Sequence, residues 1–490
     1  MVLPVESAYH RMMDVKISRR GVLAGLGSMA FAREEQKAPT SVERWGIYEA
    51  SFPGLRDGDL SAVFRTGNRE INVRGFYDGN DIYRIRFMPD STGEWTFVTN
   101  QGAKGGFRCG PPSQSNHGPV MVQDPRHLCH ADGTPHVSFG TTCYGWIHQD
   151  EQLEGRTLRS LRSSPFNKVR MCILPTESDP VRRPFEPDLS FDVTFFQHLD
   201  KRIQDLCDAG IQADLILFHP YDRVGYGALS AELNQKYLRY VVARYAAYRN
   251  VWWSIANEYD LVKTKKQPEW DDFFRIVQQS DPYGHLRSIH YSKVFYDYAK
   301  PWVTHLSLQS DQFESTGQWQ AEYGKPIVFD ECKYEGDIDK RWGNLSGHEM
   351  MRRFWMGMAS GAYVGHGETY HGRDGTAWIS KGGELLGESP KRIAFLKKVF
   401  EDAPAAGLEA MPNPYYPCIA KAKDYYLYFF DLHQPAEYEF QLPEDAGPFR
   451  GDLLDPWEMT TTPFDGSYRG KFSLKLPGKP YLAIRFQKTA

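Results

Sequence analysis

Two stretches decide the fold, WWSIANE at residues 252–258 and KPIVFDE at residues 325–331. Each is a short apolar run that ends on a glutamate, Glu258 or Glu331. A strand buried inside a parallel sheet has this composition, and α/β barrels place their chemistry at the carboxyl ends of such strands. Two carboxylates presented in this way have the functional groups that glycosidic bond cleavage needs.

The same kind of strand recurs from about residue 118 to 400. Apolar segments predict strands at 136–142, 168–174, 212–218, 251–256, 287–292, 304–308, 326–330 and 362–365. Amphipathic helices separate several of them, for example where Phe195, Leu199 and Ile203 share one helical face. Eight such units match a (β/α)8 TIM barrel, which typically needs about 250 residues. A doubly wound sheet is the alternative, but no Gly-rich phosphate loop follows the first strand.

All-β segments flank the barrel at both ends. Before it, alternating stretches predict strands at 71–76, 82–87 and 95–98. After it, short strands are predicted at 424–430, 437–441, 450–454, 471–476 and 481–486. Each end therefore predicts a small β-sandwich. The expected domains are an N-terminal sandwich over 41–117, a catalytic barrel over 118–403 and a C-terminal sandwich over 404–490.

The first 35 residues resemble an export signal. Ser18-Arg19-Arg20 precedes a mildly apolar stretch, and AFA at 30–32 looks like a small-x-small cleavage site. Paired arginines of this kind resemble a twin-arginine signal, so a periplasmic or secreted bacterial location is expected. The alternative is a disordered basic tail. No later apolar run is long enough to span a bilayer.

Composition narrows the partners. The 490 residues carry a formal net charge of −4, whereas nucleic acid usually recruits a basic patch, so no nucleic acid is expected. The 12 Trp, 28 Tyr and 29 Phe can stack on sugar rings, although sandwich cores use aromatics too. The seven cysteines are odd in number and lack a CxxC pair, which argues against a disulfide framework. The sequence leaves the oligomeric state open.

Glu258 and Glu331 end the fourth and seventh predicted strands, and barrel closure brings both to one mouth. Carboxyl groups about 5–5.5 Å apart suit a retaining double displacement, and about 6.5–9.5 Å suits inversion. One carboxyl must be protonated to help the leaving group depart, and the other must be ionised to attack. No cofactor is needed. Cys332 follows Glu331 directly but has no positioned histidine base, so a packed thiol is expected.

These motifs resemble glycoside hydrolase clan A, in which family 5 is a familiar member. The clan carries an Asn-Glu pair at the end of strand four and a second Glu at the end of strand seven. The resemblance implies that Glu258 is the acid/base and Glu331 the nucleophile. It also implies that Asn257 hydrogen-bonds the sugar 2-hydroxyl. Arg170, in FNKVR at 166–170, would support the nucleophile through a charge-assisted hydrogen bond, with a structural ion pair as the alternative.

Nearly the whole chain after the signal resembles bacterial glycoside hydrolases with an apiosidase-like barrel and domains of unknown function at both ends. The motifs that carry this resemblance are GFYDG at 75–79, TTCYGW at 141–146 and LDPWEM at 454–459. It implies the catalytic class and leaves the sugar open.

Further side chains are predicted to contact the sugar. They are Tyr144, Trp146, His219, Tyr291, Gln309, Glu368 and Trp378. Barrel-top packing is the alternative for Tyr144 and Trp146. Family 5 members commonly carry Tyr after strand six and Trp after strand eight, whereas this chain has SLQSD at 307–311 and GHGETYH at 365–371.

The segment after strand eight contains a possible metal-ligand set. His366, Glu368 and His371 imitate a zinc cluster, but such a site needs three convergent ligands. Hydrogen bonds to sugar hydroxyls are the preferred role, and no metal is expected.

The sequence thus predicts a retaining glycoside hydrolase acting on a plant or microbial oligo- or polysaccharide. The flanking sandwiches would narrow the barrel mouth and favour exo action. The alternatives are a carbohydrate-binding or adhesion protein on a barrel without catalysis, and metal-assisted hydrolysis of another ester or amide. The sugar, its ring size and its linkage stay open.

Overall fold

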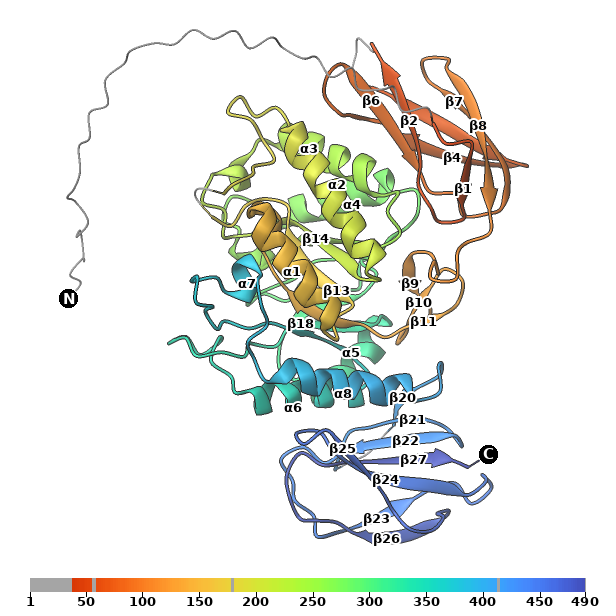
Figure 1. The fold of residues 1–490 in the computed structure, drawn as a ribbon, viewed down its shortest axis with the longest axis vertical. Coiled ribbons are helices and arrows are strands. Elements are labelled where there is room, and N and C mark those ends of the chain that lie inside the picture. Colours follow the sequence, from red (N-terminus) through yellow and green to blue (C-terminus); the bar gives the residue numbers. More distant parts are fainter. Residues whose placement is uncertain (1–37, 55–58, 178–179, 412–414, 490) are drawn as a thin grey trace, which may run out of the picture. The chain divides into compact units, whose positions relative to one another are not determined.

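The computed structural model describes residues 38–54, 59–177, 180–411 and 415–489. The predicted export signal lies outside the described residues. Within them, eight parallel strands form one central sheet in the order β16-β15-β14-β13-β12-β19-β18-β17. Figure 1 labels β13, β14 and β18 of this sheet among the surrounding helices. Their bounds are β12 (Phe139–Thr142), β13 (Lys168–Cys172), β14 (Gln212–Phe218), β15 (Val251–Ala256), β16 (Arg287–Ser288), β17 (Leu306–Gln309), β18 (Ile327–Glu331) and β19 (Tyr363–His366).

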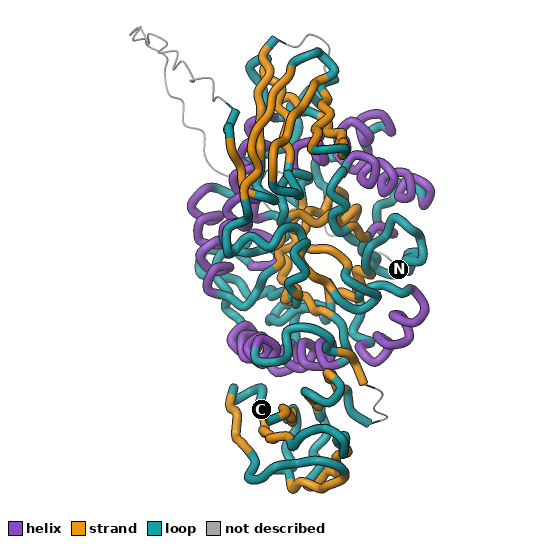
Figure 2. Tube along the Cα trace, turned by 90° about the vertical axis from the view of Figure 1, so that its right-hand side faces the viewer, coloured by secondary structure: helices purple, strands orange, loops and turns teal. Residues whose placement is uncertain are grey.

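A bridge between the two outermost strands completes the ring. His290, two residues beyond the end of β16, pairs in parallel with Ser307 on β17. Every strand therefore has a neighbour on both sides, and Figure 2 shows helices around the strands. This confirms the predicted (β/α)8 barrel and excludes a doubly wound sheet, which has two free edges.

Helices follow most of the barrel strands, and their amphipathic sequences bury one face of each. Their bounds are α1 (Glu151–Ser163), α2 (Val193–Asp208), α3 (Ala231–Tyr245), α4 (Gln267–Ser280), α5 (Thr316–Tyr323), α6 (Gly347–Ala359), α7 (Trp378–Lys381) and α8 (Ser389–Glu401). Short 3-10 helices are η1 (Trp146–His148), η2 (Tyr226–Ala228), η3 (Tyr259–Leu261) and η4 (Phe313–Ser315). On α2, the Asp192 side chain caps the first turn, and Leu199 and Ile203 of the predicted face lie fully buried in the core.

The first barrel strand is shorter than the predicted 136–142. His136 belongs instead to a separate small sheet of β9 (Val120–Val122), β10 (Leu128–His130) and β11 (Pro135–His136). Asn167 makes the break. Its Oδ1 accepts from the N–H of Phe139 at 2.7 Å, and its Nδ2 donates to the carbonyl of Val137 at 2.8 Å. In residues 137–139, the stretch that joins the small sheet to β12, the Asn167 side chain thus takes the place of backbone ladder partners.

The N-terminal segment folds as the predicted sandwich, with sheets β1-β8-β7-β3-β4 and β2-β6-β5. The strands are β1 (Ser41–Glu43), β2 (Tyr48–Pro53), β3 (Ser61–Thr66), β4 (Arg69–Arg74), β5 (Phe76–Tyr77), β6 (Ile82–Phe87), β7 (Gly93–Thr99) and β8 (Lys104–Gly110). Aromatic side chains fill the core, where the rings of Phe64 and Phe87 stack 4.0 Å apart. The predicted strand 71–76 is divided between β4 and β5.

Buried ion pairs join this sandwich to the barrel helices. Arg86 on β6 pairs with Asp200 on α2 at 2.7 Å. Arg244 on α3 pairs with Asp78 at 2.8 Å and with Asp200 at 2.6 Å. Arg244 is fully buried, so removing one partner from this network costs about 3–5 kcal/mol. The sandwich and the barrel therefore depend on each other for stability.

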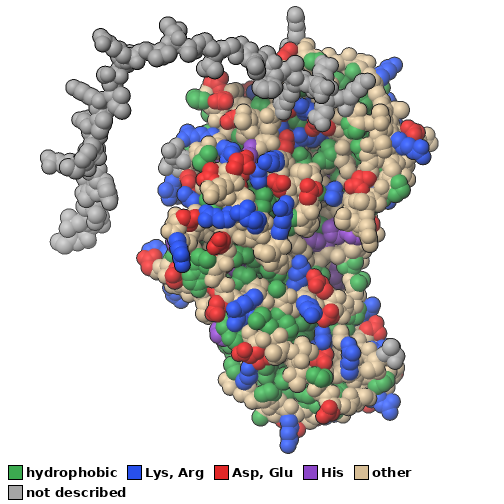
Figure 3. Space-filling view, viewed as in Figure 1, with side chains coloured by type: hydrophobic (Ala, Val, Ile, Leu, Met, Phe, Trp, Pro, Cys, Tyr) green, Lys and Arg blue, Asp and Glu red, His purple; other side chains and the backbone are tan. Residues whose placement is uncertain are grey.

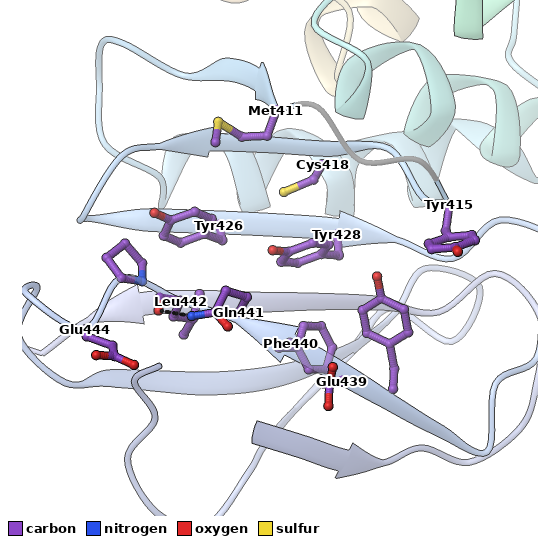
Figure 4. A pocket seen from close by; sticks show the side chains of 12 residues that line it. Met411, Tyr415, Cys418, Tyr426, Tyr428, Glu439, Phe440, Gln441, Leu442 and Glu444 are labelled. Atoms are coloured by element: carbon purple, nitrogen blue, oxygen red, sulfur yellow. Dashed lines mark hydrogen bonds between the residues drawn. The ribbon is translucent and has the colours of Figure 1, made fainter. Parts of the chain in front are cut away.

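The C-terminal segment forms a second sandwich, with sheets β20-β21-β22-β27-β24-β25 and β23-β26. The strands are β20 (Glu409–Met411), β21 (Cys418–Lys421), β22 (Tyr425–Phe429), β23 (Glu437–Gln441), β24 (Phe449–Asp455), β25 (Thr460–Pro463), β26 (Lys471–Lys475) and β27 (Ala483–Lys488). The sandwich contacts α6, where His348 stacks on Trp457 at 3.2 Å and Arg352 pairs with Asp431. A cavity of about 560 Å³ lies against β22 and β23, with Tyr426 and Tyr428 along one side (Figure 4).

The surface carries both signs of charge. On the face drawn in Figure 3, Lys and Arg side chains are interspersed with Asp and Glu. In the part of the chain that the structure describes, no helix has the length and apolar character needed to cross a bilayer.

Candidate active site

The structure brings the two predicted carboxylates together at the carboxyl end of the barrel. Glu331 ends β18 and Glu258 follows β15, and the residues are 4% and 7% exposed. Gln309, at the end of β17, joins them, since its Nε2 donates to Glu258 Oε1 and to Glu331 Oε2 at 3.1 Å each. The two oxygens are therefore at most twice this distance apart.

Glu258 has an unusual backbone conformation. Its φ of 42° and ψ of 53° lie in the left-handed region, which non-glycine residues rarely adopt and which costs of order 1–3 kcal/mol. The conformation turns the chain directly after β15. It places the carboxylate where the Tyr221 hydroxyl and the Gln309 amide donate to it. Such strain is found where a functional side chain must be aimed.

Glu331 accepts from Gln309 through Oε2, and its other oxygen, Oε1, faces further donors. The Tyr144 hydroxyl donates to Oε1, and Nη1 of Arg170 lies 3.5 Å from the same oxygen. Burial raises the pKa of Glu331, Arg170 opposes this, and the charge of Glu258 raises the pKa further. Hydrogen bonds from Tyr144 and Tyr334 favour the ionised form. The nearby carboxylate in turn adds to the effect of burial in raising the pKa of Tyr144, which keeps that hydroxyl a donor.

Arg170 points into the barrel from β13 and contacts the Asn-Glu motif. Its Nη2 donates to Oδ1 of Asn257 at 3.0 Å. Both residues are buried. Burial alone would lower the pKa of Arg170, but Asp330 and the other anions around it raise it, so the guanidinium stays charged. One side chain thus links the segments that carry Glu258 and Glu331.

A second buried layer of charges lies next to this one. Lys168, two residues before Arg170 on β13, shares its face of the sheet. Its Nζ donates to Asp214 on β14 at 3.0 Å and to Asp330 on β18 at 2.5 Å. Ser307 also donates to Asp330 at 2.5 Å. Burial would raise the pKa of Asp330, but Lys168 and Arg170 outweigh it and hold the pKa well below its usual range.

His219 orients the loop after β14. Its Nε2 donates to the Leu174 carbonyl at 2.9 Å, and its Nδ1 accepts from the N–H of Tyr221 at 3.2 Å. Burial lowers the pKa of His219, so the ring is neutral. Both ring nitrogens thus bind the backbone, and the residue positions Tyr221. Tyr291 is also mostly buried and packs on Phe295 with ring centroids 4.9 Å apart.

The two predicted tryptophan contacts lie in the core. Trp146 is fully buried and donates from Nε1 to the Met171 sulfur at 3.0 Å. Trp378 is 1% exposed and donates from Nε1 to Oγ1 of Thr141 at 2.9 Å. Trp146 therefore occupies the packing position that the sequence left as its alternative. Neither indole presents a face to solvent on which a sugar could stack.

Glu368 has other partners than the catalytic pair. It is fully buried and accepts from the backbone N–H groups of Leu386 at 2.5 Å and Gly387 at 3.0 Å. Burial raises the pKa of Glu368 to about 7. It groups with Glu335 and His366, whereas His371 of the sequence-predicted cluster is exposed and stays outside this group.

Another acidic-histidine group has a different environment. Glu151, Glu154 and His198 also place ligand atoms near one another. Here Arg202 and Arg182 lie within 3.0–3.5 Å of the two carboxylates. Arginines thus neutralise this group, whereas no Lys or Arg of the described residues pairs with Glu335 or Glu368.

Sequence reasoning missed three residues of the site. Tyr221 donates to Glu258, and the Tyr334 hydroxyl lies 3.4 Å from that of Tyr144. His290 directs Nε2 toward Glu331 at 3.9 Å, while its Nδ1 faces the N–H of Glu258 at 3.4 Å. Burial lowers the pKa of His290, and Arg170 lowers it further. The available signal was position, since each follows a barrel strand by only a few residues.

Protein-family models match three consecutive segments of the chain. Residues 122–395 match the apiosidase-like catalytic domain. Residues 41–102 match a domain of unknown function, DUF5060, and residues 415–487 match another, DUF5605. No curated protein matches the chain.

Solved structures resemble both the whole chain and its barrel. A crystal structure of a Bacteroides vulgatus ATCC 8482 protein assigned as a glycoside hydrolase has 36% identity and a TM-score of 0.87, covering 92% of this chain and 100% of that one. A glycoside hydrolase family 5 structure from the same organism has 16% identity and a TM-score of 0.63, covering 76% and 93%. The second likeness concerns the fold alone.

Proposed function

The chain belongs to the apiosidase-like glycoside hydrolases, and from this premise we propose that it hydrolyses O-glycosidic bonds with retention of anomeric configuration. Glu331 is the nucleophile and Glu258 the acid/base. The observation that carries the proposal is the Gln309 amide, which binds both carboxylates through one nitrogen at 3.1 Å each. This arrangement suits a double displacement at a carbon held between the two groups.

In the first step, an oxygen of ionised Glu331 attacks the anomeric carbon. The bond from this carbon to the leaving oxygen breaks, and Glu258 transfers its proton to that oxygen. The product is a glycosyl ester of Glu331 and a free alcohol. Tyr144 and Arg170 lie on Glu331 Oε1, so they lower the energy of the carboxylate before attack and after its release.

In the second step, Glu258 accepts a proton from water as the water oxygen attacks the anomeric carbon. The ester bond to Glu331 breaks and both glutamates return to their starting protonation states. Asn257 has its carbonyl oxygen occupied by Arg170, which turns its amide nitrogen toward Tyr221 and the space beside Glu258. That nitrogen is the proposed donor to the sugar 2-hydroxyl.

The proposed substrate is a plant or microbial oligo- or polysaccharide, cleaved from its end. Cleavage from the chain end is proposed from the architecture alone, because β-sandwiches flank the barrel at both ends of the chain. The family description makes apiosides the first glycosides to examine. A periplasmic or secreted location is proposed from the Ser18-Arg19-Arg20 motif alone.

The test is turnover of a panel of aryl furanosides and pyranosides, including an apioside, by the full chain. The product anomer is followed by NMR, and retention is expected. Glu331→Gln should reduce kcat by at least about 10³-fold, because the glycosyl ester intermediate forms on this carboxylate and an amide cannot replace it. Glu322→Gln, an exposed carboxylate, is the matched control and should have unchanged rates. An inverted product, or full activity of Glu331→Gln, would overturn the mechanism.

The other candidate, a carbohydrate-binding protein without catalysis, predicts a different result. It expects calorimetric binding of a glycan with no turnover on any aryl glycoside. The set of hydrogen bonds that orients both glutamates favours catalysis, since buried and interacting ionisable groups cluster at catalytic sites.

A further inference from the structure

We propose that Glu335, His366 and Glu368 form a site for one divalent transition-metal cation of the Zn²⁺ or Mn²⁺ class. All three side chains are fully buried, and one ligand atom of each lies within 4.8 Å of the others. An imidazole nitrogen with two carboxylates suits Zn²⁺ and Mn²⁺ better than Ca²⁺ or Mg²⁺, which favour oxygen ligands.

His366 supplies the observation that points to a ligand. Its Nε2 has no hydrogen-bond partner and lies 3.8 Å from Oε2 of Glu368. This is too long for a hydrogen bond but short enough for one cation to bridge both atoms, because two ligands about 2.0–2.1 Å from a cation lie at most about 4.2 Å apart. Oγ1 of Thr141 lies 3.2 Å from Nδ1. A proton on Nδ1 directed at that oxygen leaves the Nε2 lone pair for the cation, which is the usual outer-shell arrangement.

The charge balance leads to the same conclusion. Glu335 and Glu368 each accept two backbone N–H groups from the segment 386–389, which leads into α8. Within the described ranges, no Lys or Arg forms an ion pair with either carboxylate. Two buried carboxylates without a basic partner are unfavourable, and a divalent cation balances them. Gly387 leaves the space, because a Cβ there would lie 2.5 Å and 2.6 Å from their Oε2 atoms.

The cation would hold two loops of the barrel mouth together. Glu335 and Glu368 lie on the loops after β18 and β19, which a parallel bridge between these residues already joins. Tyr334, which precedes Glu335, hydrogen-bonds Glu331. The proposed role is structural, because the cation would fix this loop without touching the reacting atoms. The inference therefore does not depend on the catalytic roles of Glu258 and Glu331.

The test uses the full, untagged chain after stripping with dipicolinate. Titration calorimetry with ZnSO₄ and MnCl₂ should show one equivalent bound with a Kd below about 10 μM for at least one ion. The same ion should raise Tm by at least about 2 °C at saturation. Failure of both ions to bind the stripped chain would overturn the proposal.

Substitutions locate the site. Glu368→Gln keeps the size and an acceptor oxygen, and it should abolish both binding and the Tm increase, as should His366→Gln. His198→Gln, in the cluster neutralised by arginines, is the matched control and should bind like the unsubstituted chain. Circular dichroism before titration shows that each variant is folded. Binding kept in folded Glu368→Gln, or lost only in His198→Gln, would overturn the assignment.

Discussion

Arg170 donates a 3.0 Å hydrogen bond from Nη2 to Oδ1 of Asn257. The same guanidinium lies 3.5 Å from Glu331 through Nη1, so a single rigid fork orients an amide after β15 and a carboxylate on β18. Lysine could supply the charge but not two fixed directions. The charge and the geometry of Arg170 therefore make separable contributions to the site.

Replacing Arg170 with Met should move the acid limb of the kcat/KM profile to higher pH. Arg170 lowers the pKa of Glu331 against the effect of burial, so its removal raises that pKa and reduces the ionised fraction at any given pH. We also expect kcat/KM to fall at least about 100-fold, from lost orientation. In Arg170→Lys the acid limb should lie close to its position in the unsubstituted chain, because the charge is kept, whereas kcat/KM should still fall. An unchanged acid limb in Arg170→Met would contradict this role.

Replacing Gln309 with Met should lower kcat/KM by about 10- to 100-fold. Methionine has a similar length but no amide, so the two 3.1 Å bonds are lost and the carboxylates repel without a shared donor. Gln312→Met is the control on the same loop, because Gln312 is exposed. Steady-state kinetics on the best aryl glycoside checks the difference. Equal losses in both variants would mean that the loop, and not the amide, matters.

Glu331→Gln should be more stable than the unsubstituted chain at neutral pH, by about 1–2 kcal/mol. The folded-state pKa of Glu331 is raised, so the chain is favoured below the unfolded pKa of about 4.3 and loses that advantage as pH rises through the folded value. Glutamine removes the buried charge and this loss. Denaturation midpoints at pH 4.5 and 7.5 should therefore differ less in the variant. A gain of equal size at both pH values would argue against the raised pKa.

Replacing Lys168 with Met should destabilise the fold by about 3–5 kcal/mol, because Asp214 and Asp330 lose the nearer of the two cations that they share inside the barrel. Urea unfolding of the full chain measures the change. The control is Lys340→Met, whose pair with Asp339 is exposed and should contribute less than about 1 kcal/mol. A comparable midpoint for both variants would show that the buried pairs contribute little.

The ends of the barrel strands could be predicted because buried parallel strands have a distinctive composition. The bounds predicted at 212–218 and 251–256 are those observed for β14 and β15. With the strand ends fixed, Glu258 and Glu331 could be placed at one mouth of the barrel. The role of Arg170 came from the clan resemblance, and Gln309 was predicted as a sugar contact, whereas it joins the two glutamates.

The rest of the site depends on loop conformations, which the sequence pattern does not predict. Tyr334 and His290 follow barrel strands, but how their loops turn is decided by side chains distant in sequence. Trp146 and Trp378 were predicted at the mouth from type and position alone, and their burial reflects partners on other strands, Met171 and Thr141. Hydrophobic periodicity predicts which face of an element is apolar, but it does not predict which distant residue packs against that face.

The Arg244 network has a consequence for how this architecture can be divided. Asp78 of the N-terminal sandwich pairs with Arg244, a fully buried guanidinium on a barrel helix. A barrel expressed without its N-terminal segment would leave the Arg244 guanidinium without the Asp78 carboxylate. We therefore expect a chain cut at the family boundary to be insoluble. The segments that match separate family models are thus expected to fold together and not as independent units.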